Sequence, residues 1–458
     1  MESSSRPLPQ KHRFAGDRSG PRPGDGERGG RPRGPSAAET WALAIALVAG
    51  WREGRGRADH LLSDLAGGLS DRGPAQNLFY AALRHWRRTE EALRPLIARA
   101  PRARLQALLA IAGADLIENP DAPMAAIVDN AVEQAKRQLS AAEAGLVNAV
   151  LRRAAPGLRE TPVPAADAAA EELAVYFSHP SWLVKRWLAE FGGEATRALL
   201  EWNQSTAHVH VRWRAAAEPT SGLVPTPWPG FFRLAHGHWG DIQPALAAGH
   251  CYLQDPATRL APALAQPAAG ENWLELCAAP GGKTLQLADL MGSGRIVAVD
   301  RAGGRMKRFE ENIARWREAG LATEIVPQGT DVLELAPEQL GARGLPTQFD
   351  GVFIDVPCSN TGVIRHRIDA KWRLKPEEFA QLAEVQGRML AAAARFVRPG
   401  GKLVYSTCSL EPEENAEVID AFLGSEAGRG FALEDSAVGR PWEHGHDGAG
   451  AFRLRRRA

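Results

Sequence analysis

The chain has 458 residues, enough for roughly two to four domains, and its 44% hydrophobic and 24% charged residues are typical of a globular protein. A run of about 18 apolar residues is missing, and so is the apolar core of a signal peptide, so we expect neither a membrane span nor export. The net charge of +1 neither indicates nor excludes a nucleic-acid partner. The four cysteines form no C-x-x-C pair, so we expect reduced thiols, a cytoplasmic location and no metal site.

Residues 1–36 are predicted to form a disordered basic tail. Eighteen of them are Gly, Pro or Ser, and they offer no apolar face to bury. The tail has eight Arg and Lys residues against four Asp and Glu residues, so it could attract a polyanion weakly. A tail that only improves solubility is an equally good interpretation of the same composition.

Residues 37–158 are predicted to form an all-α domain. Apolar residues recur at intervals of three and four in the segments Thr40–Trp51, Gln76–Arg88, Ala103–Ile117 and Ala125–Gln138. Gly, Pro and Asn separate these segments, and strand-like alternation is missing. Such bundles are usually docking modules rather than catalysts, so we expect an interaction role here.

The stretch Thr161–Ala170, which is rich in Pro and Ala, is typical of a linker. The residues after it, 171–252, are predicted to form a small α+β segment. Its expected helices are Phe177–Phe191 and Glu194–Asn203, and its expected strands are His208–Trp213 and Gly230–Leu234.

Residues 253–458 alternate short apolar runs with helical patterns, which indicates an α/β domain with a mostly parallel sheet. The predicted strands are Trp273–Cys277, Arg295–Val299, Thr323–Pro327, Gly351–Val356 and Lys402–Thr407. The predicted helices are Thr284–Met291, Gly304–Glu318 and Pro376–Val397.

The first predicted strand runs into a loop of small residues: Cys277, Ala278, Ala279, Pro280, Gly281, Gly282 and Lys283. Glycines let a backbone approach a ligand closely, and the helix that follows presents free amides. The second strand ends at Asp300, about 20 residues further on, where a carboxylate can bind ribose hydroxyls. Because ligands bind at the carboxyl ends of the strands in such sheets, these residues predict a nucleoside site.

Two other ligands of glycine loops fit less well. A P-loop requires glycine where Cys277 stands, although the sequence Gly282-Lys283-Thr284 imitates the end of that motif. A nicotinamide site requires G-x-G-x-x-G, which the loop lacks. A nucleoside without a pyrophosphate is left, and S-adenosylmethionine fits that description.

Two later strands end beside a cysteine. Cys358 follows Asp355 by three residues, and Cys408 directly follows Thr407. A single cysteine is often only a small buried hydrophobe, but two polar-flanked thiols beside a methyl-donor loop indicate chemistry. Carbon 5 of cytosine is a poor nucleophile, and thiolate attack at carbon 6 makes carbon 5 enamine-like, so that it can accept a methyl group.

These residues together resemble the RNA cytosine-5 methyltransferases of the Sun/Fmu (RsmB) and NOL1/NOP2 group. The resemblance covers about 200 residues and includes Gln254–Pro256, Cys277–Thr284, Asp300, Asp355–Gly362, Lys371-Trp372, Thr407–Ser409, Pro412–Asn415 and Asp447–Phe452. It implies a Rossmann-like class I methyltransferase fold with S-adenosylmethionine as donor. It also implies that Cys408 is the nucleophile and that Cys358 assists product release. DNA enzymes with this chemistry attack with the Pro-Cys thiol, so the presence of both cysteines favours RNA.

The helical region is similar to the NusB-like domain of the bacterial members, through Met124–Lys136 and Leu146–Arg153. This similarity implies RNA-binding roles for residues 37–158 and 171–252, and 16S ribosomal RNA as the substrate. Three motifs depart from the family pattern. Val211-Arg212-Trp213 replaces Arg-x-Asn, Arg365–Asp369 replaces Arg-Arg-His-Pro-Asp, and Gly329-Thr330-Asp331 replaces Gly-Asp, which makes Asp331 a predicted donor contact.

The remaining predictions concern RNA and the reaction. Five basic residues in an eleven-residue stretch are predicted to contact the RNA backbone, with a solvated surface as the alternative: Arg365, Arg367, Lys371, Arg373 and Lys375. Asp355 is predicted to lie in the donor site and to hydrogen-bond the cytosine ring nitrogen. We therefore expect a monomeric cytosine-5 RNA methyltransferase. The alternatives are the same chemistry on transfer RNA and a non-catalytic RNA-binding or antitermination factor.

Overall fold

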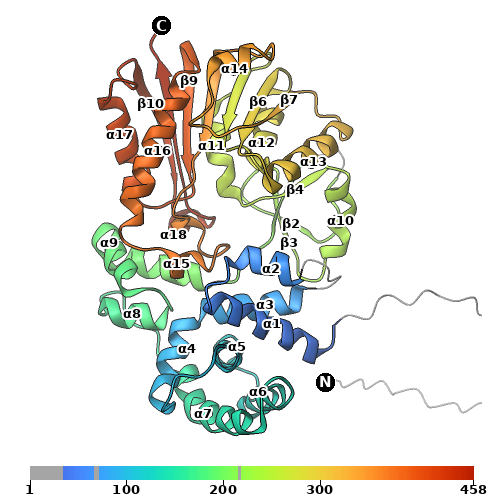
Figure 1. The fold of residues 1–458 in the computed structure, drawn as a ribbon, viewed down its shortest axis with the longest axis vertical. Helices are drawn as coiled ribbons and strands as arrows, with labels where there is room; N and C mark the ends of the chain where they lie inside the picture. The colour runs from blue at the N-terminus through green and yellow to red at the C-terminus, as the bar shows by residue number, and fades with distance from the viewer. Residues whose placement is uncertain (1–34, 67–71, 215–217) are drawn as a thin grey trace, which may run out of the picture.

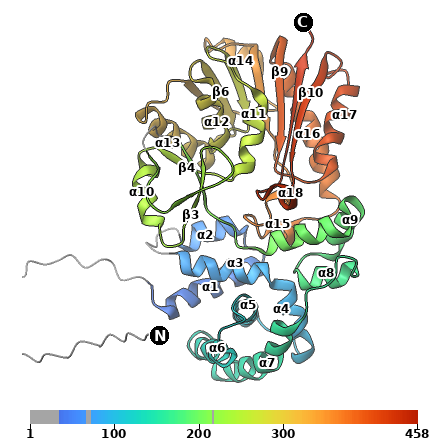
Figure 2. The ribbon, with the colours of Figure 1, turned by 180° about the vertical axis from the view of Figure 1, so that it is seen from behind.

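The computed structural model describes residues 35–66, 72–214 and 218–458. The predicted tail, residues 1–36, therefore lies outside the described residues except at its last two positions. A helical part occupies one end of the molecule and a sheet with its helices occupies the other (Figure 1). The same arrangement is visible from behind (Figure 2). Within the described ranges, no helix has both the length and the apolar character that a bilayer crossing requires.

The helical part contains α1 (Ala37–Arg52), α2 (Ala58–Ala66), α3 (Gly73–Arg84), α4 (Trp86–Leu93), α5 (Ala103–Glu118), α6 (Met124–Gln138) and α7 (Ala141–Glu160), with the short turn η1 (Arg94–Leu96). Serine side chains begin two of these helices: Ser36 accepts from the Glu39 amide and Ser140 from the Glu143 amide, each at 3.3 Å. The segment predicted as one helix over Gln76–Arg88 is two helices, which separate at His85.

The middle segment contains α8 (Ala170–Tyr176), α9 (Ser181–Gln204) and α10 (Trp239–Ala247), and four short strands. The strands β1 (His210–Trp213), β2 (Leu223–Pro225), β3 (Phe231–Leu234) and β4 (Cys251–Leu253) form an antiparallel sheet in the order β2-β3-β1-β4. The two helices predicted at Phe177–Phe191 and Glu194–Asn203 correspond to one element, α9, whose backbone is non-helical at Gly192 (φ 78°). The sequence pattern therefore located the break, although it began the helix too early.

The main sheet has seven strands in the order β10-β11-β9-β8-β5-β6-β7. Its parallel strands are β5 (Asn272–Leu276), β6 (Arg295–Asp300), β7 (Glu324–Gly329), β8 (Phe349–Asp355) and β9 (Val397–Thr407). An antiparallel hairpin of β10 (Phe431–Gly439) and β11 (Ala449–Arg456) pairs with β9. The predicted architecture, an α/β domain with a mostly parallel sheet that follows an all-α domain and a small α+β segment, is confirmed.

Helices cover both faces of this sheet: α11 (Leu260–Ala265), α12 (Gly282–Met291), α13 (Gly304–Glu318), α14 (Pro337–Gly341), α16 (Glu378–Ala394) and α17 (Ala416–Gly424). The short helices α15 (Ala370–Arg373) and α18 (Pro441–His444) lie between the sheet and the helices below it in Figure 1. Three short 3-10 turns belong to the same part of the chain: η2 (Pro256–Arg259), η3 (Thr361–Val363) and η4 (Pro412–Glu414). Successive strand residues alternate between two hydrophobic clusters, as Leu274 and Val297 do on one face and Trp273 and Ile296 on the other. Both faces are therefore buried, which explains the continuous apolar runs of these strands.

Candidate active site

The glycine loop joins β5 to α12 at the carboxyl edge of the sheet. Gly281 has φ 105°, a left-handed conformation that favours glycine, and α12 begins at Gly282. A Cβ atom at Gly281 would lie 2.6 Å from Trp316 and 2.7 Å from Phe309. Only glycine therefore fits both the backbone angle and the space, and the first amides of α12 face the edge of the sheet.

Asp300, at the end of the neighbouring strand β6, is tied to this loop. Its carboxylate accepts hydrogen bonds from the amide of Ala279 at 2.9 Å and from its neighbour Arg301 at 2.7 Å. Arg301 in turn donates to Asp331 at 2.8 Å, just after β7. The structure thus places Asp300 and Asp331 along one edge beside the glycine loop. Free amides, small residues and a carboxylate suit a nucleoside with ribose hydroxyls.

The two predicted thiols meet at the same edge, because they follow the adjacent parallel strands β8 and β9. The Sγ atoms of Cys358 and Cys408 are 2.9 Å apart, and both cysteines are free. The Cys408 thiol also donates to Oδ1 of Asn360 at 3.4 Å, and Nδ2 of Asn360 donates to the Cys358 carbonyl at 2.8 Å. Asn360 was not predicted, although it lies two residues after the Pro-Cys pair.

The four cysteines have different electrostatic environments. A hydrogen bond with Cys408, together with burial, raises the pKa of the Cys358 thiol well above its usual value. Burial alone raises the pKa of Cys251 to about 11, and burial with nearby carboxylates raises that of Cys277 to about 12. The thiols of Cys251, Cys277 and Cys358 therefore stay protonated near neutral pH.

Lys283 connects the glycine loop to the thiols. Its ammonium forms a salt bridge with Oδ1 of Asp355, which ends β8, and lies 3.3 Å from the hydroxyl of Ser406 in β9. Ser406 donates to the same carboxylate oxygen at 2.8 Å. Asp355 is thus fixed between α12, β8 and β9, and Ser406 is a partner that the sequence prediction missed.

Glu414 connects the two loops that carry Cys358 and Cys408. Its buried carboxylate accepts from the Ser359 amide at 2.9 Å, from the Ser409 hydroxyl at 2.8 Å and from Gln386 at 2.9 Å. Ser359 and Ser409 each directly follow a site cysteine. The motif Pro412–Asn415 was part of the family resemblance, but the sequence analysis assigned no role to Glu414.

A polar cluster lies next to the thiols, in which Asp447 is buried and His366 is exposed. Ligand-type atoms of Asp255, His366 and Asp447 lie within 4.8 Å of one another. The guanidinium of Arg365 lies 3.8 Å from Asp255 and 3.6 Å from Asp447, so the protein itself supplies positive charge. Burial opposes ionisation of His366, yet the carboxylates of Asp255 and Asp447, 3.8 and 3.3 Å from its ring nitrogen, hold its pKa above the usual value. These contacts describe an ion-pair network.

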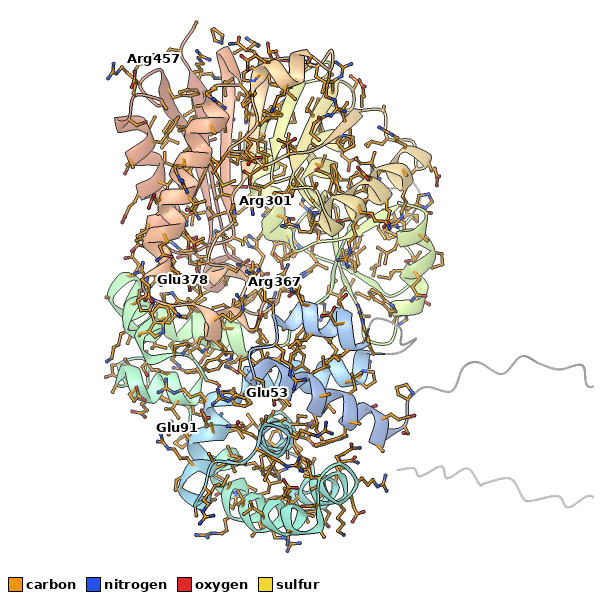
Figure 3. All side chains as sticks on the ribbon, in the orientation of Figure 1. Glu53, Glu91, Arg301, Arg367, Glu378 and Arg457 are labelled. Atoms are coloured by element: carbon orange, nitrogen blue, oxygen red, sulfur yellow. The ribbon has the colours of Figure 1, made fainter. Side chains whose placement is uncertain are left out.

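The five basic residues predicted to contact RNA divide into two groups. Arg365 and Lys371 are buried, with 5% and 0% of their surfaces exposed, and this corrects the prediction that they contact the RNA backbone. Arg365 stacks on Trp202, with Cζ 3.7 Å from the ring centroid, and Lys371 donates to the carbonyl of Arg84 at 3.3 Å. The exposed members are Arg367, Arg373 and Lys375. Arg367 lies where the helical part meets the sheet domain (Figure 3).

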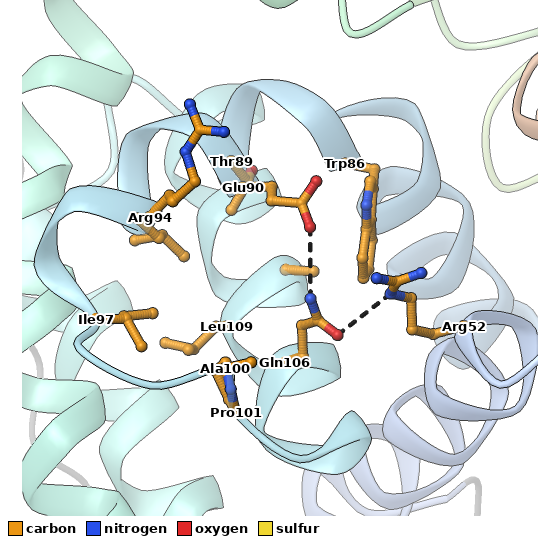
Figure 4. Close-up of a pocket in the computed structure, with 12 residues that line it drawn as sticks. Arg52, Trp86, Thr89, Glu90, Arg94, Ile97, Ala100, Pro101, Gln106 and Leu109 are labelled. Carbon is orange, nitrogen blue, oxygen red and sulfur yellow. Dashed lines mark hydrogen bonds between the residues drawn. The ribbon is translucent and has the colours of Figure 1, made fainter. Parts of the chain in front are cut away.

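Two cavities differ in chemistry. One of about 450 Å³ lies in the helical part, where Gln106 bonds Arg52 at 3.3 Å and Glu90 at 3.5 Å (Figure 4). Its other lining residues are mostly apolar: Trp86, Thr89, Leu93, Arg94, Ile97, Ala100, Pro101, Leu109 and Ala110. The second cavity, of about 50 Å³, touches both Lys283 and Cys408. Of the predicted site residues, Lys283 and Cys408 therefore share the smaller cavity, together with Ser406.

Sequence comparisons identify both parts of the chain. The family described as 16S rRNA methyltransferase RsmB/F matches residues 262–436, and the NusB family matches residues 55–156. A ribosomal RNA small subunit methyltransferase B from Klebsiella pneumoniae is 34% identical over 316 residues, which cover 66% of this chain and 69% of that protein. The protein of the same name from Vibrio cholerae is 31% identical over 413 residues, 83% of this chain and 91% of that protein.

Solved structures share the fold. The crystal structure of PH0851 superposes with a TM-score of 0.70 at 22% identity, and covers 91% of this chain and 98% of its own. A methyltransferase homolog from Pyrococcus horikoshii has a TM-score of 0.53 at 22% identity and covers 63% of this chain and 99% of its own. The predicted class I methyltransferase fold and the predicted family are thus confirmed. This chain belongs to the RsmB/F family of 16S rRNA methyltransferases and is an RNA methyltransferase.

Proposed function

We propose that this enzyme transfers a methyl group from S-adenosylmethionine to carbon 5 of a cytosine in 16S ribosomal RNA, and that Cys408 is its nucleophile. The observation that carries the proposal is the pair of thiols, 2.9 Å apart, at the sheet edge that also bears the nucleoside-type loop. The names of the relatives support the RNA substrate. We further propose that the protein acts as a cytoplasmic monomer.

The donor site is proposed to consist of the loop Cys277–Lys283 with Asp300, Asp331 and Asp355. The residues fit the donor, because Gly281, with φ 105° and no space for a Cβ, turns the loop tightly into α12 beside the carboxylate of Asp300. S-adenosylmethionine supplies an electrophilic methyl group when it is bound. Asp300 would hold the ribose, and the amides at the start of α12 would hold the rest of the nucleoside.

The first chemical step is attack of the Cys408 thiolate on carbon 6 of the cytosine, which forms a sulfur–carbon bond and moves electron density to the ring nitrogen and carbon 5. Asp355 is proposed to hydrogen-bond the ring nitrogen, where this electron density develops. Lys283, in contact with Asp355, supplies compensating positive charge. Carbon 5 then accepts the methyl group.

Release reverses the addition. Water takes the carbon-5 proton, the electron pair of that bond restores the ring double bond, and Cys408 leaves with the electron pair of the broken sulfur–carbon bond. The raised pKa of Cys358 keeps that thiol protonated near neutral pH, so it can donate a hydrogen bond to the departing sulfur. Cys358 is therefore proposed to assist release rather than attack.

The domain assignment is part of the proposal. Residues 37–158 and 171–252 are proposed to bind RNA, and residues 253–458 to perform the chemistry. Arg367, Arg373 and Lys375 present exposed charge at the junction between these parts, which suits a phosphate backbone. Arg367 and Arg373 are paired with Asp59 and Asp369 at 2.9 and 2.8 Å, so RNA would have to compete with those pairs.

Bisulfite sequencing of 16S ribosomal RNA from a deletion strain tests the function. One cytosine should lose protection in the deletion strain and regain it with the wild-type gene, but not with a gene that carries Cys408→Ser. Loss of protection in a transfer RNA instead would favour the alternative substrate. Unchanged protection everywhere would favour a non-catalytic RNA-binding factor.

A further inference from the structure

The segment that runs from the Pro-Cys thiol to the end of α15 links the active site to the helical part. We call residues 358–373 the anchor loop. Its first residues are part of the thiol site, since Asn360 accepts from the Cys408 thiol and donates to the Cys358 carbonyl. Asn360 adopts the left-handed conformation (φ 64°), which fixes its side chain toward both cysteines. Any shift of this end of the loop changes the geometry of the two thiols.

The other end of the anchor loop is built into the helical part. Ile368 is 2% exposed and belongs to the hydrophobic core of that part, and Trp372 packs against the same core. The indole of Trp372 donates to the Leu83 carbonyl at 3.0 Å, and the ammonium of Lys371 donates to the Arg84 carbonyl at 3.3 Å. α15 lies beside the helices of the N-terminal part in both views (Figures 1 and 2).

Charged contacts on α2 reinforce this attachment. Asp369 accepts from the Ala58 amide at 3.3 Å, at the start of α2, and Arg367 forms an ion pair with Asp59 at 2.9 Å. These partners are separated by more than 300 residues in the chain. The helical part therefore holds the anchor loop through its core, its backbone carbonyls and its surface charges.

The middle of the anchor loop has little room to absorb movement. The Gly362 amide donates to the Cys408 carbonyl at 3.0 Å, and the Gly362 carbonyl accepts from the Gly448 amide at 2.7 Å. A Cβ at Gly362 would lie 2.7 Å from the Cys408 carbonyl oxygen and 2.8 Å from the backbone of Gly448, so these three loop segments are in direct contact. Ile364 is fully buried against the α8–α9 cluster. Displacement at one end of such a packed segment is transmitted to the other.

We propose that the helical part, through Lys371 and Trp372 in the anchor loop, sets the geometry of the Cys358–Cys408 pair. Lys371 and Trp372 are then positioning residues for methyl transfer and the helical part is more than an RNA-binding module. The proposal deepens the proposed function and rests on it for the methylation readout, but not for the thiol readout described below.

The test uses the full-length protein with the variants Lys371→Met and Trp372→Ala. Methionine keeps the length and apolar stem of Lys371 but removes the buried charge and its hydrogen bond, a change that proteins often tolerate. We expect the single-turnover methylation rate to fall at least about tenfold, because small misplacements of reacting groups are costly. The dissociation constants for RNA and for the donor should change less than about threefold, and Trp372→Phe should recover most of the rate.

Lys307→Met, the same replacement on the exposed surface of α13, is the matched control and should leave the rate unchanged. A rate unchanged in the folded Lys371→Met and Trp372→Ala proteins would overturn the proposal. Loss of RNA affinity that accounts for the whole effect would also overturn it, because the anchor loop would then serve binding alone.

A second readout needs no RNA. The rate at which iodoacetamide alkylates Cys408, measured by peptide mass spectrometry, should change at least about threefold in both anchor variants and stay at the wild-type value in Lys307→Met. Unchanged Cys408 reactivity would contradict a positioning role. If the wild-type protein methylates no RNA but the anchor variants still change the reactivity of Cys408, the proposed function is wrong and the coupling between the helical part and the thiols is retained.

Discussion

The active site has two halves that are built in different ways. The donor half, residues 277–283 with Asp300, comes from one strand, one loop, one helix start and the next strand along the chain. The thiol half, Cys358 and Cys408, depends on Glu414 beneath it and on an anchor loop whose far end lies in the core of the helical part. Local backbone geometry thus prepares one half, and long-range packing prepares the other.

This difference suggests how the two functions can be separated. A donor half that forms from adjacent elements should bind its ligand whatever the helical part does. A thiol half that depends on distant segments should respond to changes far from the cysteines. Mutations can therefore break one half and leave the other intact.

The largest expected effect is that of Cys408→Ser. A serine hydroxyl supplies almost no alkoxide near neutral pH, so turnover should fall on the order of a thousandfold or more. Donor affinity, measured by calorimetry, should stay within about twofold of wild type. Substantial turnover in this variant would assign the attack to another group.

Asp300→Ala should break the donor half alone. Loss of a carboxylate that binds ribose hydroxyls and holds the Ala279 amide should weaken donor binding at least about tenfold, or about 1.4 kcal/mol. Iodoacetamide should still alkylate Cys408 at the wild-type rate. Unchanged calorimetric affinity in the folded variant would remove Asp300 from the donor site.

A smaller, pH-dependent effect is expected in the ion-pair network beside the thiols. Burial, opposed by His366, raises the pKa of Asp447 to about 6 from 3.8. Its favourable contribution to stability is complete below pH 3.8 and is lost as the pH rises through about 6. The raised pKa of His366 acts in the same direction.

Asp447→Asn cannot ionise, so its stability should depend less on pH. Relative to wild type, its free energy of unfolding should rise by about 1 kcal/mol between pH 5 and pH 8. Urea unfolding curves at the two pH values measure this difference, with Asp420→Asn on α17 as a control for a general charge effect. A difference that is constant or falls with pH would contradict the assigned protonation.

The smallest effect is expected from the exposed charges near the junction. The double variant Arg373→Ala and Lys375→Ala should flatten the slope of log affinity for RNA against log salt by about one to two units. An unaltered slope would indicate a solvated surface without RNA contacts.

The sequence predicted the donor half more completely than the thiol half. Gly281 and Asp300 could be placed because a glycine loop between a strand and a helix has a known local geometry. The meeting of Cys358 and Cys408 also followed, since both come after parallel strands. The roles of Glu414 and Asn360 did not follow, because they depend on which loops pack together.

The same limit applies to the fold. The helix Gly304–Glu318 was predicted with its observed bounds, because its apolar residues recur at helical spacing. The strand β10 was missed, since it is exposed along most of its length and carries acidic residues that weaken the apolar alternation. Lys371 was predicted to contact RNA because it is one of five basic residues in an eleven-residue stretch, and only tertiary packing reveals that its side chain is fully buried.

The most direct test of the central claim, that Cys408 attacks and Cys358 assists release, is a denaturing gel of the protein after incubation with RNA and S-adenosylmethionine. Cys358→Ala should methylate the RNA and then stall, giving a slower band that RNase removes, and Cys408→Ser should give no such band. A trapped band in Cys408→Ser and none in Cys358→Ala would show that the two thiols have the opposite roles.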